Sequence, residues 1–190
     1  MSNFDTQFAV GKVGESEIAN WLKARGNHIL PIYEIEQGQG KGPQLYTSDG
    51  GELIAPDMLC FGNGKTVWIE AKHKNAFSWH RLTKRWTTGI DLHHYEQYIR
   101  VSNLVEWPVW LLFLQKPGVA KDTPKDEIPP LPGLYGGDLT KLICNENHRH
   151  DNWGKSGMVY WEVDTLTKLA GYPLTTTMTK DESWESFNAG

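Results

Sequence analysis

The sequence predicts an α/β fold, with a central mixed β-sheet flanked by helices on both faces. Two segments with a helical period, residues 4–25 and 91–104, alternate with apolar segments of strand length. An Asn-Gly pair also lies between two of these apolar segments, which is the strongest short-range signal for a hairpin. Helices that alternate with groups of strands are typical of a sheet covered by helices.

The first helix is expected over residues 4–25, because one stripe of residues recurs there at spacings of three and four. Gly26-Asn27 follows as a stop signal of the left-handed type. One acidic residue, Glu15, falls on the otherwise apolar stripe. The stripe consists of Phe4, Phe8, Gly11, Glu15, Ile18 and Leu22.

The next strands are expected to form a meander. A strand over residues 28–36 is followed by a glycine-rich mobile loop over 37–51. The hairpin comes next, with one strand in the segment 53–61 and its partner in the segment 66–72. Asn63-Gly64 forms its turn, because both residues accept the positive φ of a type I′ turn.

This turn defines the register of the hairpin. Gly62 pairs with Lys65, and counting outward places Asp57 opposite Glu70 in a non-hydrogen-bonded pair. The period of two places Lys72 on the same face of the strand as Glu70. Like charges that face each other repel, so a fold that retains them requires a cation between them. Two carboxylates and an ammonium on one face therefore indicate a metal-dependent site for phosphate chemistry.

The second helix begins after Asp91, which is a plausible N-cap. Its inward side is expected to consist of Leu92, Tyr95, Ile99 and Ser102. The segment before it, residues 77–89, is interpreted as a loop or a short helix.

The remaining segments complete the predicted sheet. Residues 109–114 form a continuous apolar run, which fits a strand buried on both faces. Residues 116–133 contain five of the ten prolines and form a surface excursion. A last strand over 158–163 and a short helix over 165–170 follow. We expect one domain over residues 1–172 and a polar C-terminal tail over 173–190.

Three motifs, in this order along the chain, resemble those of the PD-(D/E)xK nuclease superfamily. They are Gly11-Lys12-Val13-Gly14-Glu15 on the helix, Pro56-Asp57 on one hairpin strand and Glu70-Ala71-Lys72 on the other. The resemblance covers residues 4–115 and points to the Holliday-junction-resolvase-like and restriction-endonuclease-like branch. It implies a restriction-endonuclease-like core and a Mg²⁺-dependent DNA endonuclease that also accepts Mn²⁺.

The resemblance also implies a role for each motif residue. Asp57 and Glu70 would hold Mg²⁺, with the Ala71 carbonyl as a further ligand. Glu15 would orient the attacking water or hold a second ion. Lys72 would neutralise the scissile phosphate or help to deprotonate the water. The small size of the chain favours structure-selective cleavage of branched DNA and suggests a homodimer, since cutting two strands takes two sites.

A basic and aromatic segment over residues 72–86 is expected to contact DNA. The net charge of −4 differs from that of a general nucleic-acid-binding domain, but basic side chains gather in this segment. They would reach phosphates, while Trp79 or Trp86 stacks on bases. A solvated loop with its tryptophans in the core is the alternative. The predicted DNA-binding residues are Lys74, Arg81, Lys84, Arg85 and Trp79.

Other interpretations stay open. Asp57, Glu70 and Lys72 would form a surface ion-pair face if the hairpin were exposed. The alternative function is a catalytically inactive nuclease-fold module that binds DNA or protein. A binding protein that uses its nine tryptophans for a ligand such as a sugar is a second rival. The cluster Cys144, His148, His150 and Asp151 matches no standard zinc finger and is interpreted as an ordinary polar loop.

The location of the protein follows from what the sequence lacks. No apolar run approaches the length of a membrane span, and the N-terminus lacks the basic and apolar regions of a signal peptide. Cys60 and Cys144 do not form a disulfide framework. We therefore expect an intracellular, cytoplasmic protein without membrane association.

Overall fold

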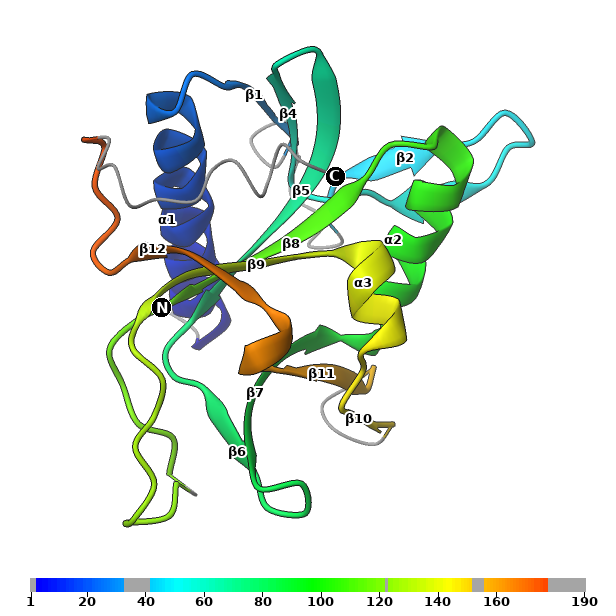
Figure 1. Ribbon diagram of the computed structural model, residues 1–190. Coiled ribbons are helices and arrows are strands. Elements are labelled where there is room, and N and C mark those ends of the chain that lie inside the picture. The colour runs from blue at the N-terminus through cyan, green and yellow to red at the C-terminus, as the bar shows by residue number, and fades with distance from the viewer. Residues whose placement is uncertain (1–2, 33–41, 122, 152–155, 178–190) are drawn as a thin grey trace.

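The computed structural model describes residues 3–32, 42–121, 123–151 and 156–177, with side chains described from residue 11 onward. The described residues form three sheets, of six, four and two strands, together with the α-helices α1, α2 and α3 (Figure 1). Their side chains make two apolar cores. Within these ranges, no helix is both long enough and apolar enough to cross a membrane.

The central sheet is mixed and has six strands, in the order β1-β4-β5-β8-β9-β12. β5 and β8 run parallel, and all the other neighbours are antiparallel. This confirms the predicted class of a mixed α/β sheet. The strands are β1 (His28–Pro31), β4 (Met58–Gly62), β5 (Lys65–Lys74), β8 (Val109–Gln115), β9 (Gly133–Asp138) and β12 (Thr167–Gly171).

A second, four-stranded antiparallel sheet has the order β10-β11-β7-β6, and a short pair β2-β3 stands apart from it. Figure 1 shows the β6–β7 hairpin projecting from the body of the molecule. The strands are β6 (Ser78–His80), β7 (Arg85–Asp91), β10 (His148–His150) and β11 (Met158–Glu162), with β2 (Gln44–Tyr46) and β3 (Glu52–Ile54) in the short pair.

Helices cover both faces of the central sheet. α1 (Asn3–Ala24) packs on the face that contains Ile69 and Leu112. α2 (Leu92–Val105) and α3 (Leu139–Cys144) pack on the opposite face, together with the second sheet. The alternation of β8 explains the two cores, because odd and even positions of this fully buried strand point to opposite faces.

The predicted hairpin turn is confirmed. Asn63 and Gly64 have φ values of 50° and 74°, which are the positive values that a type I′ turn requires. Gly62 pairs with Lys65, and the predicted register continues outward along β4 and β5 to the pair of Met58 and Ile69.

The first helix, the buried strand β8 and the excursion after it also agree with the sequence. The side chains of Phe4 and Phe8 lie outside the described part, while Ile18 and Leu22 are fully buried. β1 ends at Pro31, so the rest of the predicted strand over 28–36 is either a single helical residue, Ile32, or not described. No helix or strand lies between Lys116 and Pro132 in the described residues.

Three segments differ from the sequence-based expectation. Residues 77–89 form most of the β6–β7 hairpin, because β7 pairs with β11, a distant strand. Part of the predicted loop over 37–51 pairs instead as β2 with β3. The predicted short helix over 165–170 is wrong, since Val163–Thr165 is one 3-10 turn and β12 follows. β12 can pair beside β9 because Gly136 leaves room for the side chain of Leu169. A Cβ at position 136 would lie only 2.9 Å from that side chain.

The segment 158–163 was expected to be the last strand. It forms β11, which belongs to the second sheet, and β12 is the last strand. The inward side of α2 agrees in part: Tyr95 is buried, and Leu92 and Ile99 pack against the core as predicted. Tyr98 and Val101 are buried as well, although the sequence did not place them inward. Asp91 occupies the N-cap position but makes no capping hydrogen bond; its carboxylate accepts one from the Ser156 hydroxyl at 3.1 Å.

Candidate active site

The hairpin brings the two carboxylates of the sequence motif to facing positions. Asp57 directly precedes β4, and the β4–β5 register, continued by one residue, places it opposite Glu70. Oδ2 of Asp57 accepts a hydrogen bond of 2.8 Å from the backbone N–H of Ala71. Asp57 is therefore fixed to the strand that carries Glu70 and Lys72. The exposed fraction of Asp57 is 8% and that of Glu70 is 0%, which rules out the interpretation as a surface ion-pair face.

Glu70 and Lys72 point to the same face of β5 and touch each other. Nζ of Lys72 forms an ion pair with Oε1 of Glu70. Burial alone would lower the pKa of Lys72, but the carboxylates of Glu70 and Asp57 outweigh it and raise that pKa. Both carboxylate oxygens of Glu70 are buried, and the Tyr98 hydroxyl lies within hydrogen-bonding reach of this carboxylate. A buried carboxylate oxygen of this kind costs free energy unless a cation or donor meets it.

The electrostatics at Asp57 also favour a cation at this site. Burial raises the pKa of Asp57 well above its ordinary value, and the negative charge of Glu70 raises it further. Glu15 adds to this effect, whereas Lys72 and the hydrogen bond from Ala71 oppose it. The ionised form of Asp57 is therefore disfavoured, because the single ammonium of Lys72 does not offset burial and the neighbouring carboxylates.

The charge of Glu15 acts on the site because α1 packs closely against β5. Gly14 makes this possible, since a Cβ at that position would lie 2.6 Å from Cβ of His73. Glu15 is half-buried, and its charge raises the pKa of both Asp57 and Lys72. The structure thus places the four predicted catalytic residues close enough together for their charges to interact.

α2 adds two residues that the sequence argument missed. The pKa of Tyr98 is raised by burial, by the negative charges of Glu70 and Asp57, and by a hydrogen bond between its hydroxyl and Glu70. One turn earlier, the pKa of His94 is lowered by burial and by Lys72. Nδ1 of His94 is buried without a hydrogen-bond partner among the described groups. The sequence did contain a signal for this pair, because His94 and Tyr98 are four residues apart and so lie on the same side of a helix.

Gln97 lies on the same helix. Its Oε1 accepts a hydrogen bond of 3.4 Å from the backbone N–H of Ile54, just before the Pro56-Asp57 motif. The side chain therefore joins α2 to the chain leading into the site.

The donor set suits a hard divalent cation. Asp57 and Glu70 offer carboxylate oxygens, which Mg²⁺ and Mn²⁺ prefer, and both oxygens of Glu70 are buried. Within the described ranges, no three His, Cys, Asp or Glu side chains stand close enough together to hold a metal ion. Two carboxylates with an adjacent backbone carbonyl, at Ala71, form the set that the residues do provide.

The predicted DNA-binding residues divide into two groups. Arg81, Lys84 and Arg85 are exposed at the end of the β6–β7 hairpin. Lys74 lies at the end of β5, where burial and the charge of Lys72 lower its pKa to about 8. Trp79 is half-buried and packs edge-on against Trp86, with ring centroids 5.1 Å apart.

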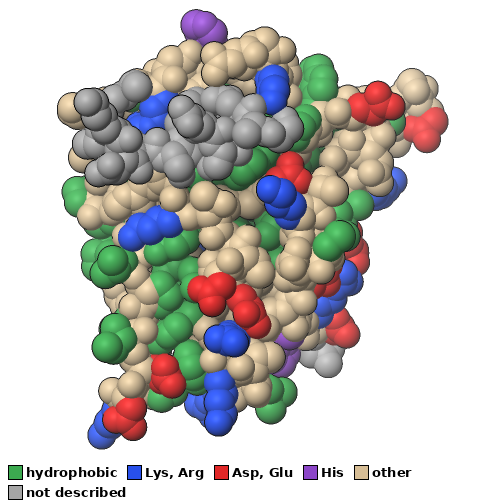
Figure 2. Space-filling view, in the orientation of Figure 1, with side chains coloured by type: hydrophobic (Ala, Val, Ile, Leu, Met, Phe, Trp, Pro, Cys, Tyr) green, Lys and Arg blue, Asp and Glu red, His purple; other side chains and the backbone are tan. Residues whose placement is uncertain are grey.

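Charge is not segregated on the face seen in Figure 2, where acidic and basic side chains are intermixed. Many of the tryptophans are core residues, which disfavours a tryptophan platform for a ligand such as a sugar. The buried ones include Trp21, Trp68, Trp110 and Trp161.

The histidines near Cys144 form an aromatic stack. His148 lies between His80 and Tyr160, with ring centroids 3.7 Å and 4.5 Å away and nearly parallel planes. His80 belongs to β6 and Tyr160 to β11, so the stack joins the hairpin to the rest of the second sheet.

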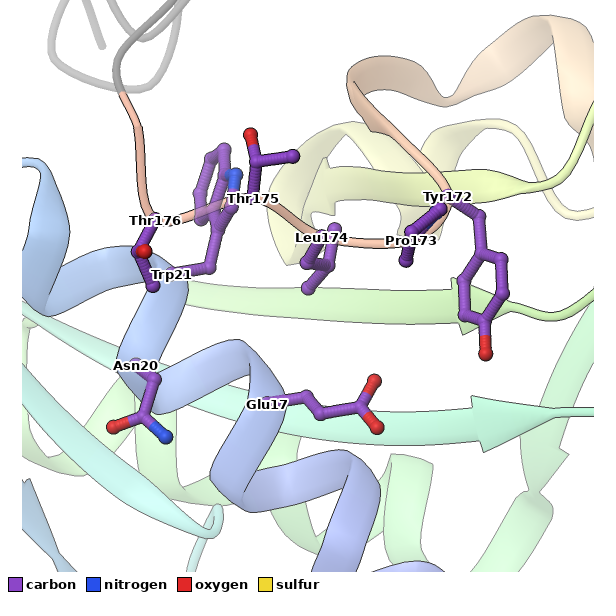
Figure 3. Close-up of a pocket in the computed structure, with 8 residues that line it drawn as sticks. All are labelled: Glu17, Asn20, Trp21, Tyr172, Pro173, Leu174, Thr175 and Thr176. Atoms are coloured by element: carbon purple, nitrogen blue, oxygen red, sulfur yellow. The ribbon is translucent and has the colours of Figure 1, made fainter.

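A pocket of about 320 Å³ lies elsewhere, between α1 and the segment after β12 (Figure 3). Glu17 and Trp21 approach it from the helix, and Tyr172 and Leu174 from the other side. Tyr172 and Leu174 pack against the apolar core on this face, so the beginning of the predicted tail is part of the packed structure. None of the four predicted catalytic residues lines this pocket.

Comparison with known proteins gives a distant likeness. No family model matches the sequence, and no curated protein matches it. Among solved structures, the chain is similar to Hjc, a Holliday junction resolvase from the archaeal hyperthermophile Archaeoglobus fulgidus. The two sequences are 10% identical, the match covers 82% of this chain and 90% of that chain, and the TM-score is 0.46.

Proposed function

We propose that the protein is a Mg²⁺-dependent DNA endonuclease that hydrolyses phosphodiester bonds, with a restriction-endonuclease-like core. One observation carries the proposal: Asp57 and Glu70 are buried at facing positions of one hairpin, and Lys72 pairs with Glu70. A fold gains no stability from opposing two buried carboxylates, so their retention argues for a function that uses them.

Each residue of the site would have its own role in the hydrolysis. Asp57, Glu70 and the Ala71 carbonyl would hold Mg²⁺, with Mn²⁺ as a substitute. When bound, the ion would stabilise the charge that develops on the phosphate and lower the pKa of the attacking water. Lys72 would bring a positive charge to the scissile phosphate, and Glu15 would orient the water from α1.

DNA would be held mainly by cations outside this centre. Arg81, Lys84 and Arg85 are exposed and would contact phosphates, with Lys74 closer to the carboxylates. Trp79 would contribute its half-exposed ring. We propose branched DNA as the preferred substrate and a homodimer as the active form, in the cytoplasm.

The test compares cleavage of a supercoiled plasmid, a four-way junction and a matched linear duplex, each with Mg²⁺, Mn²⁺ or EDTA. Asp57→Ala and Lys72→Ala should lose cleavage, whereas Asp126→Ala and Lys125→Ala, exposed residues of the excursion, should retain it. Equal cleavage by all four variants would rule out this site. Salt-sensitive binding of DNA without any metal-dependent product would instead support the inactive DNA-binding module.

A further inference from the structure

We propose that the tip of the β6–β7 hairpin, residues 81–84, is an apolar wedge that inserts into DNA where base stacking is already interrupted. The inference rests on the DNA endonuclease function proposed above and names the feature by which the protein would recognise branched DNA. It concerns a part of the molecule that contributes no carboxylate to the candidate active site.

The apex of the hairpin combines an apolar side chain with positive charge. Leu82 lies in the four-residue loop between β6 and β7, and 88% of its surface is exposed. A single exposed leucine is ordinary on a protein surface. Here, however, Arg81, Lys84 and Arg85 are also exposed, and no acidic residue occurs between Ser78 and Ile90. The tip is therefore amphipathic, because the apolar Leu82 stands between the cationic residues Arg81 and Lys84 in the loop.

Contacts with β10 and β11 hold the tip in place. Nδ1 of His80 and Oγ1 of Thr83 lie 2.8 Å apart, which closes the loop on itself. The side-chain amide of Asn147 donates a hydrogen bond of 3.4 Å to Oγ1 of Thr83 and another of 2.7 Å to Glu162. The His80 ring also stacks on His148. A tip fixed in this way loses little conformational entropy when it binds a partner.

The hairpin is also connected directly to the candidate active site. β5 carries Glu70 and Lys72 and ends at Lys74, and β6 begins four residues later. From there the hairpin projects from the body of the molecule (Figure 1). The tip and the strand that carries Glu70 and Lys72 therefore belong to one continuous segment of the chain, residues 65–91.

The chemistry of the tip selects DNA of a particular kind. Cations contact the phosphates, and proteins that kink DNA insert apolar side chains such as leucine between base steps. Unstacking costs free energy, and the cost is smallest where a branch, flap or mismatch has already broken the stack. We therefore expect the tip to favour branch points over continuous duplex.

The experiment measures binding without cleavage, in EDTA, with the full chain. Fluorescence anisotropy gives the affinity for a three-way junction and for a linear duplex, and 2-aminopurine at the branch point reports unstacking. Leu82→Ala should weaken junction binding about tenfold through lost apolar contact. It should change duplex binding less than twofold and abolish the 2-aminopurine signal. Leu131→Ala, which alters another leucine that is 71% exposed, should behave as the wild type.

Junction binding and 2-aminopurine signals that are equal for the wild type and Leu82→Ala would overturn the wedge. Cleavage of plasmid with Mg²⁺ is measured separately. If Leu82→Ala has no effect on junction binding but the wild type cleaves plasmid, only the wedge is overturned. If Leu82→Ala weakens junction binding but the wild type does not cleave plasmid, only the nuclease proposal is overturned. Failure to bind either DNA overturns both. Leu82-dependent binding to phosphatidylglycerol vesicles in place of DNA would identify the tip as a membrane-inserting element and overturn the wedge as well.

Discussion

Asp57 and Ala71 are joined by a hydrogen bond of 2.8 Å from the backbone N–H of Ala71 to the Asp57 carboxylate. The bond fixes Asp57 beside the strand that carries Glu70, although the two carboxylates repel each other. Replacement of Asp57 by asparagine preserves an oxygen that can accept this bond and removes the charge. The substitution therefore separates the chemical role of Asp57 from its structural role.

Asp57→Asn should lower the rate of metal-dependent cleavage at least about a hundredfold, because a charged ligand of the cation is lost. In EDTA the same change should raise the free energy of unfolding by about 1 kcal/mol, since burial and Glu70 disfavour the charge of Asp57. Plasmid cleavage and urea denaturation measure the two effects. Asp126→Asn, at an exposed position, is the control and should change neither. A stability loss in Asp57→Asn would contradict the account.

Lys72→Met should destabilise the fold by about 3 kcal/mol, because it leaves the fully buried Glu70 without its ion-pair partner. Adding Glu70→Gln to this variant should restore most of the loss, since Glu70 is then neutral and no longer requires an ion-pair partner. The measurement is a double-mutant cycle of urea unfolding in EDTA. Additive losses in the double variant would show that the pair is not coupled.

Gly14→Ala should lower the free energy of unfolding by about 1–3 kcal/mol, because its Cβ would lie 2.6 Å from Cβ of His73 and push α1 away from β5. Cleavage should fall as well, since Glu15 moves with the helix. Gly11→Ala is a matched control in the same helix, where the nearest heavy atom to the new Cβ is 4.0 Å away. This control should be neutral or stabilising, by up to about 1 kcal/mol. Equal effects at both glycines would refute the close contact.

The two cysteines should differ in reactivity. Burial raises the pKa of Cys60 to about 12, whereas Cys144 is exposed. Iodoacetamide at pH 8 should therefore label the native protein once, at Cys144, and the urea-unfolded protein twice, as mass spectrometry would show. Because the Cys60 pKa is higher in the folded than in the unfolded state, its contribution to stability is complete below about pH 8.5 and is lost as the pH rises towards 12. Rapid double labelling of the native protein would contradict this burial.

The stacked histidines should make the second sheet sensitive to acid. Burial and the neighbours His80 and His150 lower the pKa of His148 to about 4. A folded-state pKa below the unfolded value of about 6.5 means that stability is complete above pH 6.5 and is lost as the pH falls towards 4. His148→Gln should weaken this dependence, and His28→Gln, at an exposed histidine, should not. NMR titration of His148 and urea midpoints at several pH values measure it; an ordinary titration near pH 6.5 would refute the stack.

The sequence determined those parts of the fold that depend on neighbours in the chain. The turn at Asn63-Gly64 requires two residues that accept positive φ, and the period of two along a strand then fixes every facing pair, including Asp57 and Glu70. The same local rules predicted α1 and the doubly buried strand β8. The carboxylate pair could therefore be found without a structure, because it lies within one hairpin.

Tertiary structure decided the parts that depend on distant partners. Residues 77–89 carry weak local signals and form strands because β7 pairs with β11. Residues 167–171 form a strand because they pair with β9, where Gly136 leaves room for Leu169. The approach of Glu15 depends on how closely α1 packs, and the positions of His94 and Tyr98 depend on the rotation of α2 about its axis. That rotation is set by packing against the core, in which Tyr95, Tyr98 and Val101 are buried.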